Sequence, residues 1–221
     1  MAHETETFIK GKLNQKQASD CQIALSALAA FWQVVEINKG GWSSRTQLPV
    51  IQCCILSALT VRDILHGMGR RDAAVCKSGL QVEVVEGSLP YAVTIGSPLA
   101  AEIADQWNAH MVVKLGDLVI DPTIGQARRA WNNLPQSAVF RDGMCAGRRV
   151  QLAENHSAPV TTRHIYNDGN RKIRVSYFKL PKRVEQMICG WQDVPDADYE
   201  RRARFVEDAL ALLRQPQPIA A

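Results

Sequence analysis

The stretch that decides the fold is Leu48–Met68, LPVIQCCILSALTVRDILHGM. Its apolar residues recur at spacings of three and four, which is the pattern of a helix with one buried stripe. That stripe consists of Val50, Cys54, Ala58, Val61, Leu65 and Met68. Pro49 suits a first helical turn, and Gly67 and Gly69 are typical stop signals. The segment is therefore predicted to be a buried helix with two adjacent cysteines near its start.

The two adjacent cysteines, Cys53 and Cys54, point in different directions on this helix. Cys54 lies in the middle of the apolar stripe, whereas Cys53 is rotated away from it by about 100°. A cysteine in the first turns of a helix feels the positive end of the helix dipole, which favours the thiolate. A small core residue is the plainer interpretation, because free cysteine is among the most buried residue types. The helix by itself leaves both interpretations open.

A second stretch, residues 108–123 (NAHMVVKLGDLVIDPT), predicts a β-hairpin. Two segments of strand-like alternation, His110–Leu115 and Leu118–Asp121, flank Gly116-Asp117. Glycine at the first of these two positions suits a two-residue type II′ turn. Because strand side chains alternate, the turn determines which residues of the two strands share a face.

With this turn, His110 and Asp121 point to the same face as diagonal neighbours, with Cα atoms about 7–8 Å apart. The strand that carries Asp121 is otherwise apolar, and a buried carboxylate needs a partner. We therefore predict a hydrogen bond between the His110 imidazole and the Asp121 carboxylate. The alternative is an accidental polar pair on a solvated face.

Cys54, His110 and Asp121 are the candidate catalytic residues. A thiol becomes a good nucleophile when a neighbouring imidazole takes its proton, and a carboxylate behind the imidazole orients the ring. Acyl transfer through a thioester also requires an oxyanion hole. Backbone N–H groups at the start of the cysteine helix could form one arm, and Gln47 or Gln52 could form the other. An ordinary loop or surface role is an equally good interpretation of either glutamine.

These residues resemble the transglutaminase-like, papain-related superfamily of cysteine enzymes. In the cysteine helix the family pattern falls on Cys54, Ala58, Leu65 and Gly69. In the hairpin it falls on Ala109-His110, on Gly116 and on Asp121-Pro122, and the order cysteine, histidine, aspartate also agrees. The resemblance covers residues 42–123 and implies amide or thioester chemistry: peptide hydrolysis, deamidation or acyl transfer to an amine. Cys53 remains an alternative nucleophile.

Composition limits the other classes of function. The chain has 221 residues, 46% of them hydrophobic, and a formal net charge of +4, which suits one globular domain. No segment concentrates Lys and Arg with aromatic residues, so a nucleic-acid partner is not indicated. Pairs of arginines such as Arg128-Arg129 fit solvated faces or a surface for an anionic partner. Neither a cofactor nor a metal site is expected, because the chain has no glycine-rich phosphate loop and no C-x-x-C pair.

The N-terminus lacks the apolar core of a secretory signal, and no run of about 18 apolar residues predicts a membrane span. We therefore expect a cytoplasmic protein, in which the six cysteines are thiols.

The rest of the chain predicts a single α+β domain, with a buried N-terminal helix packed on an antiparallel sheet as in a papain or transglutaminase-like core. Its expected limits are a flexible N-terminus (1–15), a catalytic domain (16–215) and a flexible tail (216–221). The expected elements are a helix from a capping box at Ser19-x-x-Gln22 to Ile37, strands at Asp72–Cys76, Leu80–Glu86 and Tyr91–Ile95, a hairpin over Thr161–Leu180, and a last helix capped by Asp196 or Asp198. Residues 124–159 are expected to be mainly long connections.

The leading hypothesis is a cysteine hydrolase or acyltransferase that acts on an amide bond of a protein or peptide. The choice between hydrolysis and transfer stays open, as does the oligomeric state. The second hypothesis is a catalytically inactive relative that binds a protein partner through a basic surface.

Overall fold

The computed structural model describes residues 4–9, 11–38, 54–86, 91–96, 109–142, 147–153, 156–180, 192 and 197–215. Its helical elements are α1 (Gln15–Ile37), α2 (Cys54–Gly67), the short 3-10 helix η2 (Ile124–Ala127) and α4 (Glu200–Arg214). Its strands are β1 (Thr5–Phe8), β2 (Ala74–Val84), β3 (Ala92–Ile95), β4 (His110–Leu115), β5 (Leu118–Asp121), β6 (Ser137–Arg141), β7 (Arg149–Ala153), β8 (His156–Asp168) and β9 (Arg171–Phe178). Helices and strands are segregated, which is the expected α+β class.

The strands form one mixed sheet in the order β1-β6-β5-β4-β2-β9-β8-β7, with β3 paired to β2. β1 runs parallel to β6, and the other pairings are antiparallel. The expectation of a purely antiparallel sheet is therefore wrong at one edge. The same strand corrects the prediction that residues 1–15 are flexible. Thr5–Phe8 is part of the sheet because Phe8 is buried, stacked on the Phe140 ring at 5.1 Å between centroids.

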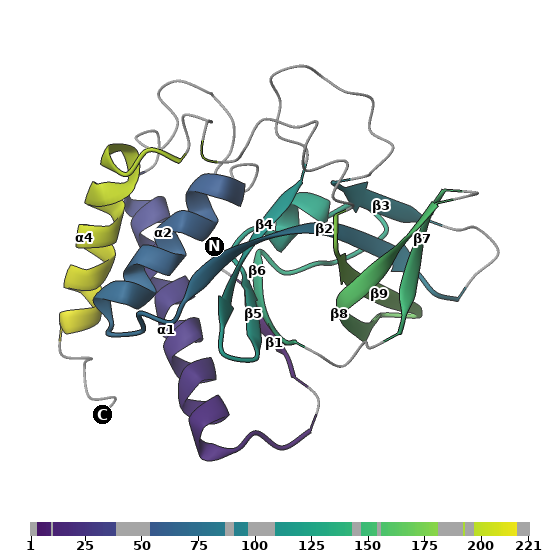
Figure 1. Ribbon diagram of the computed structural model, residues 1–221, viewed down its shortest axis with the longest axis horizontal. Helices are drawn as coiled ribbons and strands as arrows, with labels where there is room; N and C mark the ends of the chain where they lie inside the picture. Colours follow the sequence, from purple (N-terminus) through teal and green to yellow (C-terminus); the bar gives the residue numbers. More distant parts are fainter. Residues whose placement is uncertain are drawn as a thin grey trace.

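β2 joins the two halves of the sheet. Residues 74–78 pair with β4, and residues 79–84 pair with β9. The sequence predicted two short strands separated by a turn at Lys77-Ser78-Gly79, but the ladder is continuous through these residues. Gly79 allows this continuity because the Phe178 ring packs where a Cβ atom would lie. Figure 1 shows β2 crossing from the helical side of the molecule to β9.

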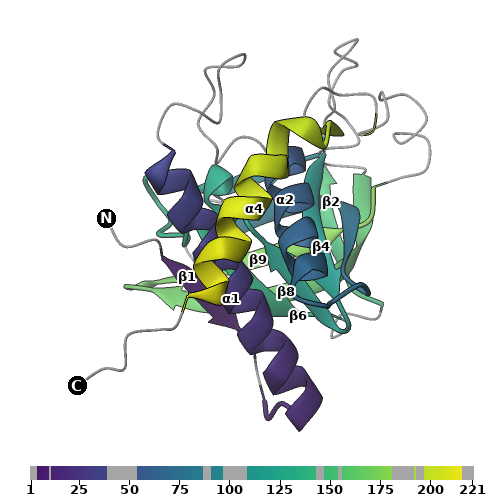
Figure 2. The same cartoon turned by 90° about the vertical axis from the view of Figure 1, so that its left-hand side faces the viewer.

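The described α-helices, α1, α2 and α4, cover one face of β4, β5 and β6, and Figure 2 shows them as a layer in front of the sheet. Their apolar side chains form one core with the inward residues of these strands, including Met111, Val113 and Ile120. The opposite face of the same strands packs against β2 and β9, with Val112, Val119 and Tyr177 among the buried residues. β4 and β5 are thus buried on both faces, and they are the strands that carry His110 and Asp121.

The first and last described helices are both present, and α1 ends at Ile37 as predicted, but neither has its predicted N-cap: the N-cap residues are Asn14 for α1 and Tyr199 for α4. α1 begins four residues before the predicted cap, because the capping box is formed by Asn14 and Gln17 rather than by Ser19 and Gln22. For α4, the Asp198 carboxylate accepts a hydrogen bond from the Glu200 amide at 3.0 Å. Asp196, the other predicted cap, lies outside the described residues.

α1 is long and apolar enough to cross a bilayer by length and composition, which the sequence analysis did not anticipate. Half of its apolar window is buried inside the fold. Its buried residues pack with α2, α4 and the sheet, as in the central helix of a core.

α2 ends as the glycines predict. Gly69 has a φ of 88°. The Gly69 amide donates to the His66 carbonyl and the Arg70 amide donates to the Leu65 carbonyl, which is a Schellman motif. Arg70 then pairs with Asp20 of α1. At the other side of α2, the buried Arg202 of α4 donates to Asp63 at 2.8 Å. Ion pairs therefore tie α2 to both neighbouring helices.

Residues 124–159 hold more regular structure than the sequence predicted, namely η2, β6, β7 and the start of β8. β6 was not predicted, because its apolar run, Ala138–Phe140, is buried on both faces. Such a strand shows no alternation of apolar and polar residues. The hairpin over 161–180 is present as β8 and β9, with its turn at Gly169.

Candidate active site

The hairpin that carries the predicted histidine and aspartate has the predicted register. β4 pairs with β5 through Leu115–Leu118, Lys114–Val119 and Val113–Ile120. Gly116 has a φ of 61°, the left-handed conformation that a two-residue turn of this kind requires. His110 therefore lies at the first residue of β4 and Asp121 at the last residue of β5.

The His110 imidazole and the Asp121 carboxylate form a hydrogen bond. The distance between Nε2 and Oδ2 is 2.7 Å, and both side chains are 0% exposed. The predicted pair is therefore buried, and the alternative of a solvated face is wrong. Since the carboxylate accepts at Nε2, the imidazole carries a proton on that nitrogen and presents Nδ1 on its other side.

Two further groups hold the Asp121 carboxylate. The Tyr177 hydroxyl donates to Oδ2 at 2.7 Å, and the Thr123 backbone amide donates to Oδ1 at 2.8 Å. Burial raises the pKa of Tyr177 well above its usual value, and the Asp121 charge raises it further, so the phenol remains a donor. The carboxylate thus has three donors from three different segments, which compensates its removal from water.

Gln126 of η2 faces the other nitrogen of the imidazole. Its amide nitrogen lies 3.1 Å from His110 Nδ1 and donates to Thr123 Oγ1 at 3.0 Å. In the neutral ring, Nδ1 is an acceptor and suits this amide donor. When Nδ1 is protonated, a half-turn of the Gln126 amide would place the amide oxygen at Nδ1 as an acceptor. The Thr123 hydroxyl suits both orientations, because it can accept from the amide nitrogen or donate to the amide oxygen.

The charged state of His110 is favoured despite its burial. Burial alone lowers the pKa of the imidazole, but the Asp121 charge, the Asp121 hydrogen bond, and the hydrogen bond and charge of Cys54 together raise that pKa to about 10. A raised imidazole pKa favours transfer of a proton from a neighbouring thiol to the ring.

Cys54 is the first described residue of α2 and is 8% exposed; the predicted helix start at Pro49 lies outside the described residues. Its thiol lies 3.9 Å from the carbonyl oxygen of Ala109, the residue directly before His110, and its charge contributes to the raised pKa of the His110 imidazole. The structure therefore brings Cys54, His110 and Asp121 together. The other predicted candidates, Cys53, Gln47 and Gln52, lie outside the described residues.

Sequence reasoning missed Tyr177, Thr123 and Gln126. Alternation along β9 places Tyr177 on one face with Val175, but nothing in the sequence relates that face to Asp121. Thr123 carried a usable signal, since an aspartate commonly accepts from the amide two residues later. Among the described residues, no group of three or more His, Cys, Asp or Glu side chains is placed to hold a metal ion.

No family model, no curated protein and no solved structure matches the chain. A thiol at a helix start, an imidazole with one nitrogen anchored, and a buried carboxylate are the parts of a nucleophile activated by a base.

Proposed function

We propose that the protein is a cysteine hydrolase or acyltransferase that acts on an amide bond through Cys54, His110 and Asp121. The observation that carries this proposal is the fully buried His110–Asp121 hydrogen bond, beside which the Cys54 thiol lies 3.9 Å from the carbonyl oxygen of Ala109, the residue before His110. Core packing alone does not account for a buried histidine and aspartate, because apolar residues of similar volume pack without the cost of removing charges from water.

The proposed reaction starts at the Cys54 sulfur. With the thiol proton already held on His110 as an imidazolium, the sulfur attacks the amide carbon, and the carbonyl oxygen gains the negative charge. His110 then returns the proton to the nitrogen as the carbon–nitrogen bond breaks, which leaves a thioester and a free amine. Water or a second amine attacks the thioester and loses a proton to His110, and the carbon–sulfur bond breaks to release the Cys54 thiolate beside the imidazolium. Asp121 stabilises the imidazolium throughout. Backbone N–H groups of the first turn of α2 are the proposed donors to the oxyanion.

A transglutaminase-like, papain-related core is part of the same proposal. A cysteine at the start of a helix, a histidine at the start of one strand and an aspartate at the end of the next are the features that support it. A protein or peptide substrate and a cytoplasmic location, both expected from the sequence, belong to this proposal.

The arginine pairs that motivated a binding module are largely tied into the fold. Arg128 donates to the Leu134 carbonyl and Arg129 to the Gln126 carbonyl, so this pair braces the loop that holds Gln126. Arg70 and Arg202 are paired with Asp20 and Asp63. These contacts favour the enzymatic proposal over a basic binding surface.

The test measures the reactivity of individual thiols. We expect iodoacetamide to label Cys54 faster at neutral pH than Cys21, since burial raises the pKa of the Cys21 thiol. His110→Gln should slow the labelling of Cys54 by about tenfold or more and leave that of Cys76, a half-buried thiol on β2, unchanged. Peptide mapping by mass spectrometry measures all three rates in one sample.

A second measurement distinguishes hydrolysis from transfer. Glutaminyl peptides incubated with hydroxylamine should give a hydroxamate if the thioester passes to amines, and ammonia with a free carboxylate if water is the acceptor. Cys54→Ala should abolish either product, whereas Cys76→Ala should not. Product formation that survives in Cys54→Ala, or equal labelling of Cys54 in His110→Gln and the unaltered chain, would refute the proposal.

A further inference from the structure

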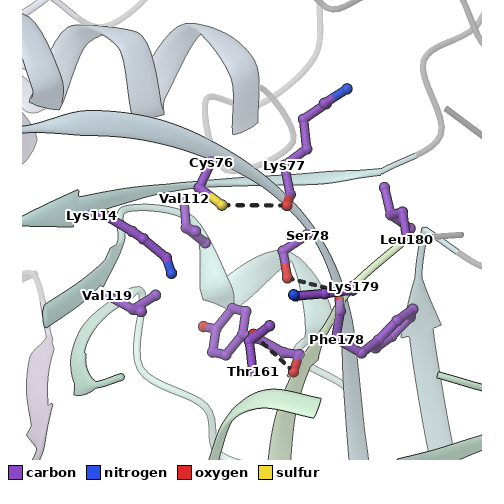
Figure 3. Close-up of a pocket in the computed structure, with 11 residues that line it drawn as sticks. Cys76, Lys77, Ser78, Val112, Lys114, Val119, Thr161, Phe178, Lys179 and Leu180 are labelled. Carbon is purple, nitrogen blue, oxygen red and sulfur yellow. Dashed lines mark hydrogen bonds between the residues drawn. The ribbon is translucent and has the colours of Figure 1, made fainter. Parts of the chain in front are cut away.

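A cavity of about 310 Å³ lies beside the buried site, on the face of β4 and β5 away from the helices. Val112 of β4, Val119 of β5 and Phe178 of β9 form its apolar walls, and Leu180 lies at its side (Figure 3). This volume is at the lower end of the range for small-molecule sites, so the cavity can enclose a compact organic molecule.

The cavity also collects positive charge. Lys77, Lys114 and Lys179 line it, and none of its described lining residues is acidic. Figure 3 shows Lys114 and Lys179 pointing toward one another from opposite sides, whereas Lys77 points away. Lys114 Nζ is balanced by Asp142 Oδ2 at 2.6 Å. Within the part of the chain that the structure describes, no carboxylate lies at ion-pair distance from Lys179.

The hydroxyl groups of the cavity already have acceptors. Ser78 Oγ donates to the carbonyls of Gly79 and Phe178, and Thr161 Oγ1 donates to the Tyr177 carbonyl. The Lys179 ammonium points into the cavity (Figure 3) and forms no ion pair with a described carboxylate, so its N–H groups can donate to a ligand. One cationic group at the edge of an apolar cavity suits a ligand with one anionic group and an apolar body.

We propose that this cavity binds a small organic carboxylate, with its apolar body against Val112 and Val119 and its carboxylate on the Lys179 ammonium. This site is separate from the thiol chemistry, since Cys54 is not among its lining residues. The cavity adjoins the candidate catalytic residues through Tyr177, which lines the cavity and whose hydroxyl donates to Asp121.

Isothermal titration calorimetry of the whole chain tests the proposal with 3-phenylpropionate and its neutral analogue 3-phenylpropionamide. The two probes have the same apolar body and differ in charge. We expect the carboxylate to bind at least about tenfold more tightly than the amide, and this preference to shrink at high salt concentration. Lys179→Gln should remove the preference, and Lys77→Gln, a matched change at a lysine that points away, should keep it.

Methyl NMR of valine-labelled protein locates the probe, since bound 3-phenylpropionate should shift the signals of Val112 and Val119. The proposal is overturned if the carboxylate does not bind, if the amide binds equally well, if Lys179→Gln retains the preference, or if the shifts lie elsewhere. Repeating the titration with Cys54→Ala separates this site from the proposed activity. The cavity should bind the probe whether or not the thiol is catalytic.

Discussion

At the scale of single residues, two tyrosines of one core differ in whether a hydrogen bond compensates the burial of the hydroxyl group. The Tyr177 hydroxyl donates to Asp121, next to the hydrogen bond from His110. The Tyr166 hydroxyl is buried and has no hydrogen-bond partner among the described residues. A buried polar group with a partner stabilises the fold, whereas one without a partner costs free energy.

Replacing each tyrosine with phenylalanine should therefore have opposite effects. Tyr177→Phe removes a donor from a buried carboxylate and should lower the free energy of unfolding by about 1–3 kcal/mol. It should also slow iodoacetamide labelling of Cys54, because Asp121 is then less firmly placed behind His110. Tyr166→Phe should leave the free energy of unfolding unchanged or raise it by about 1 kcal/mol. Urea unfolding followed by tryptophan fluorescence measures both, and equal losses in the two variants would contradict the assignment.

At the scale of elements, close backbone contacts determine how β2 and α2 pack. A Cβ atom on Gly79 would overlap the Phe178 ring across the β2–β9 ladder. A Cβ atom on Gly67 would meet the end of the Leu210 side chain at 2.5 Å. The aromatic ring is rigid and enclosed, whereas the leucine end is flexible, so the two glycines tolerate substitution differently.

Gly79→Ala should lower the free energy of unfolding by about 1–3 kcal/mol, because the ring must move within a packed core. Gly67→Ala should change it by less than about 1 kcal/mol, since the gain in helix propensity offsets the movement of Leu210. Thermal and urea unfolding of the two variants make a matched comparison. Equal stability of both variants would show that Phe178 does not constrain β2.

At the scale of the whole molecule, the proton on His110 links stability to pH. The groups that raise the pKa of this imidazole come from two other elements, Cys54 of α2 and Asp121 of β5, and they lie near it only in the folded chain. The unfolded chain has an ordinary histidine with a pKa of 6.5, and the folded chain one of about 10. The stabilisation is therefore complete below pH 6.5 and is lost as the pH rises through 10.

Between these two values the free energy of unfolding should fall by up to about 1.4 kcal/mol per pH unit from this one group. Asp121→Asn removes the carboxylate charge and should flatten this part of the profile. Urea unfolding over this pH range measures the slope, and NMR of the His110 ring carbon, identified with His110→Gln, measures the titration directly. Titration of the His110 ring near its ordinary pKa would contradict the hydrogen-bonded His110–Asp121 pair.

The sequence by itself determined the parts of the molecule that depend on neighbours along the chain. The hairpin register follows from Gly116 and from alternation over a few residues, so His110 and Asp121 could be paired without coordinates. The buried character of α2 and its glycine stop follow equally from helical spacing. Asn14-x-x-Gln17 has the same capping pattern as Ser19-x-x-Gln22, and the prediction at Ser19 placed the cap of α1 five residues too late.

Only the tertiary structure decided which of these parts meet. Cys54 lies 55 residues from Ala109, and Asp121 lies 56 residues from Tyr177, so their contacts depend on which faces of separate elements pack together. The same dependence explains β1 and the continuous β2. Thr5–Phe8 is a strand because β6 offers an open edge and Phe140 a surface for Phe8, and β2 is unbroken because Phe178 fills the space beside Gly79. Periodicity shows that a face is apolar, whereas packing in three dimensions selects the face that covers it.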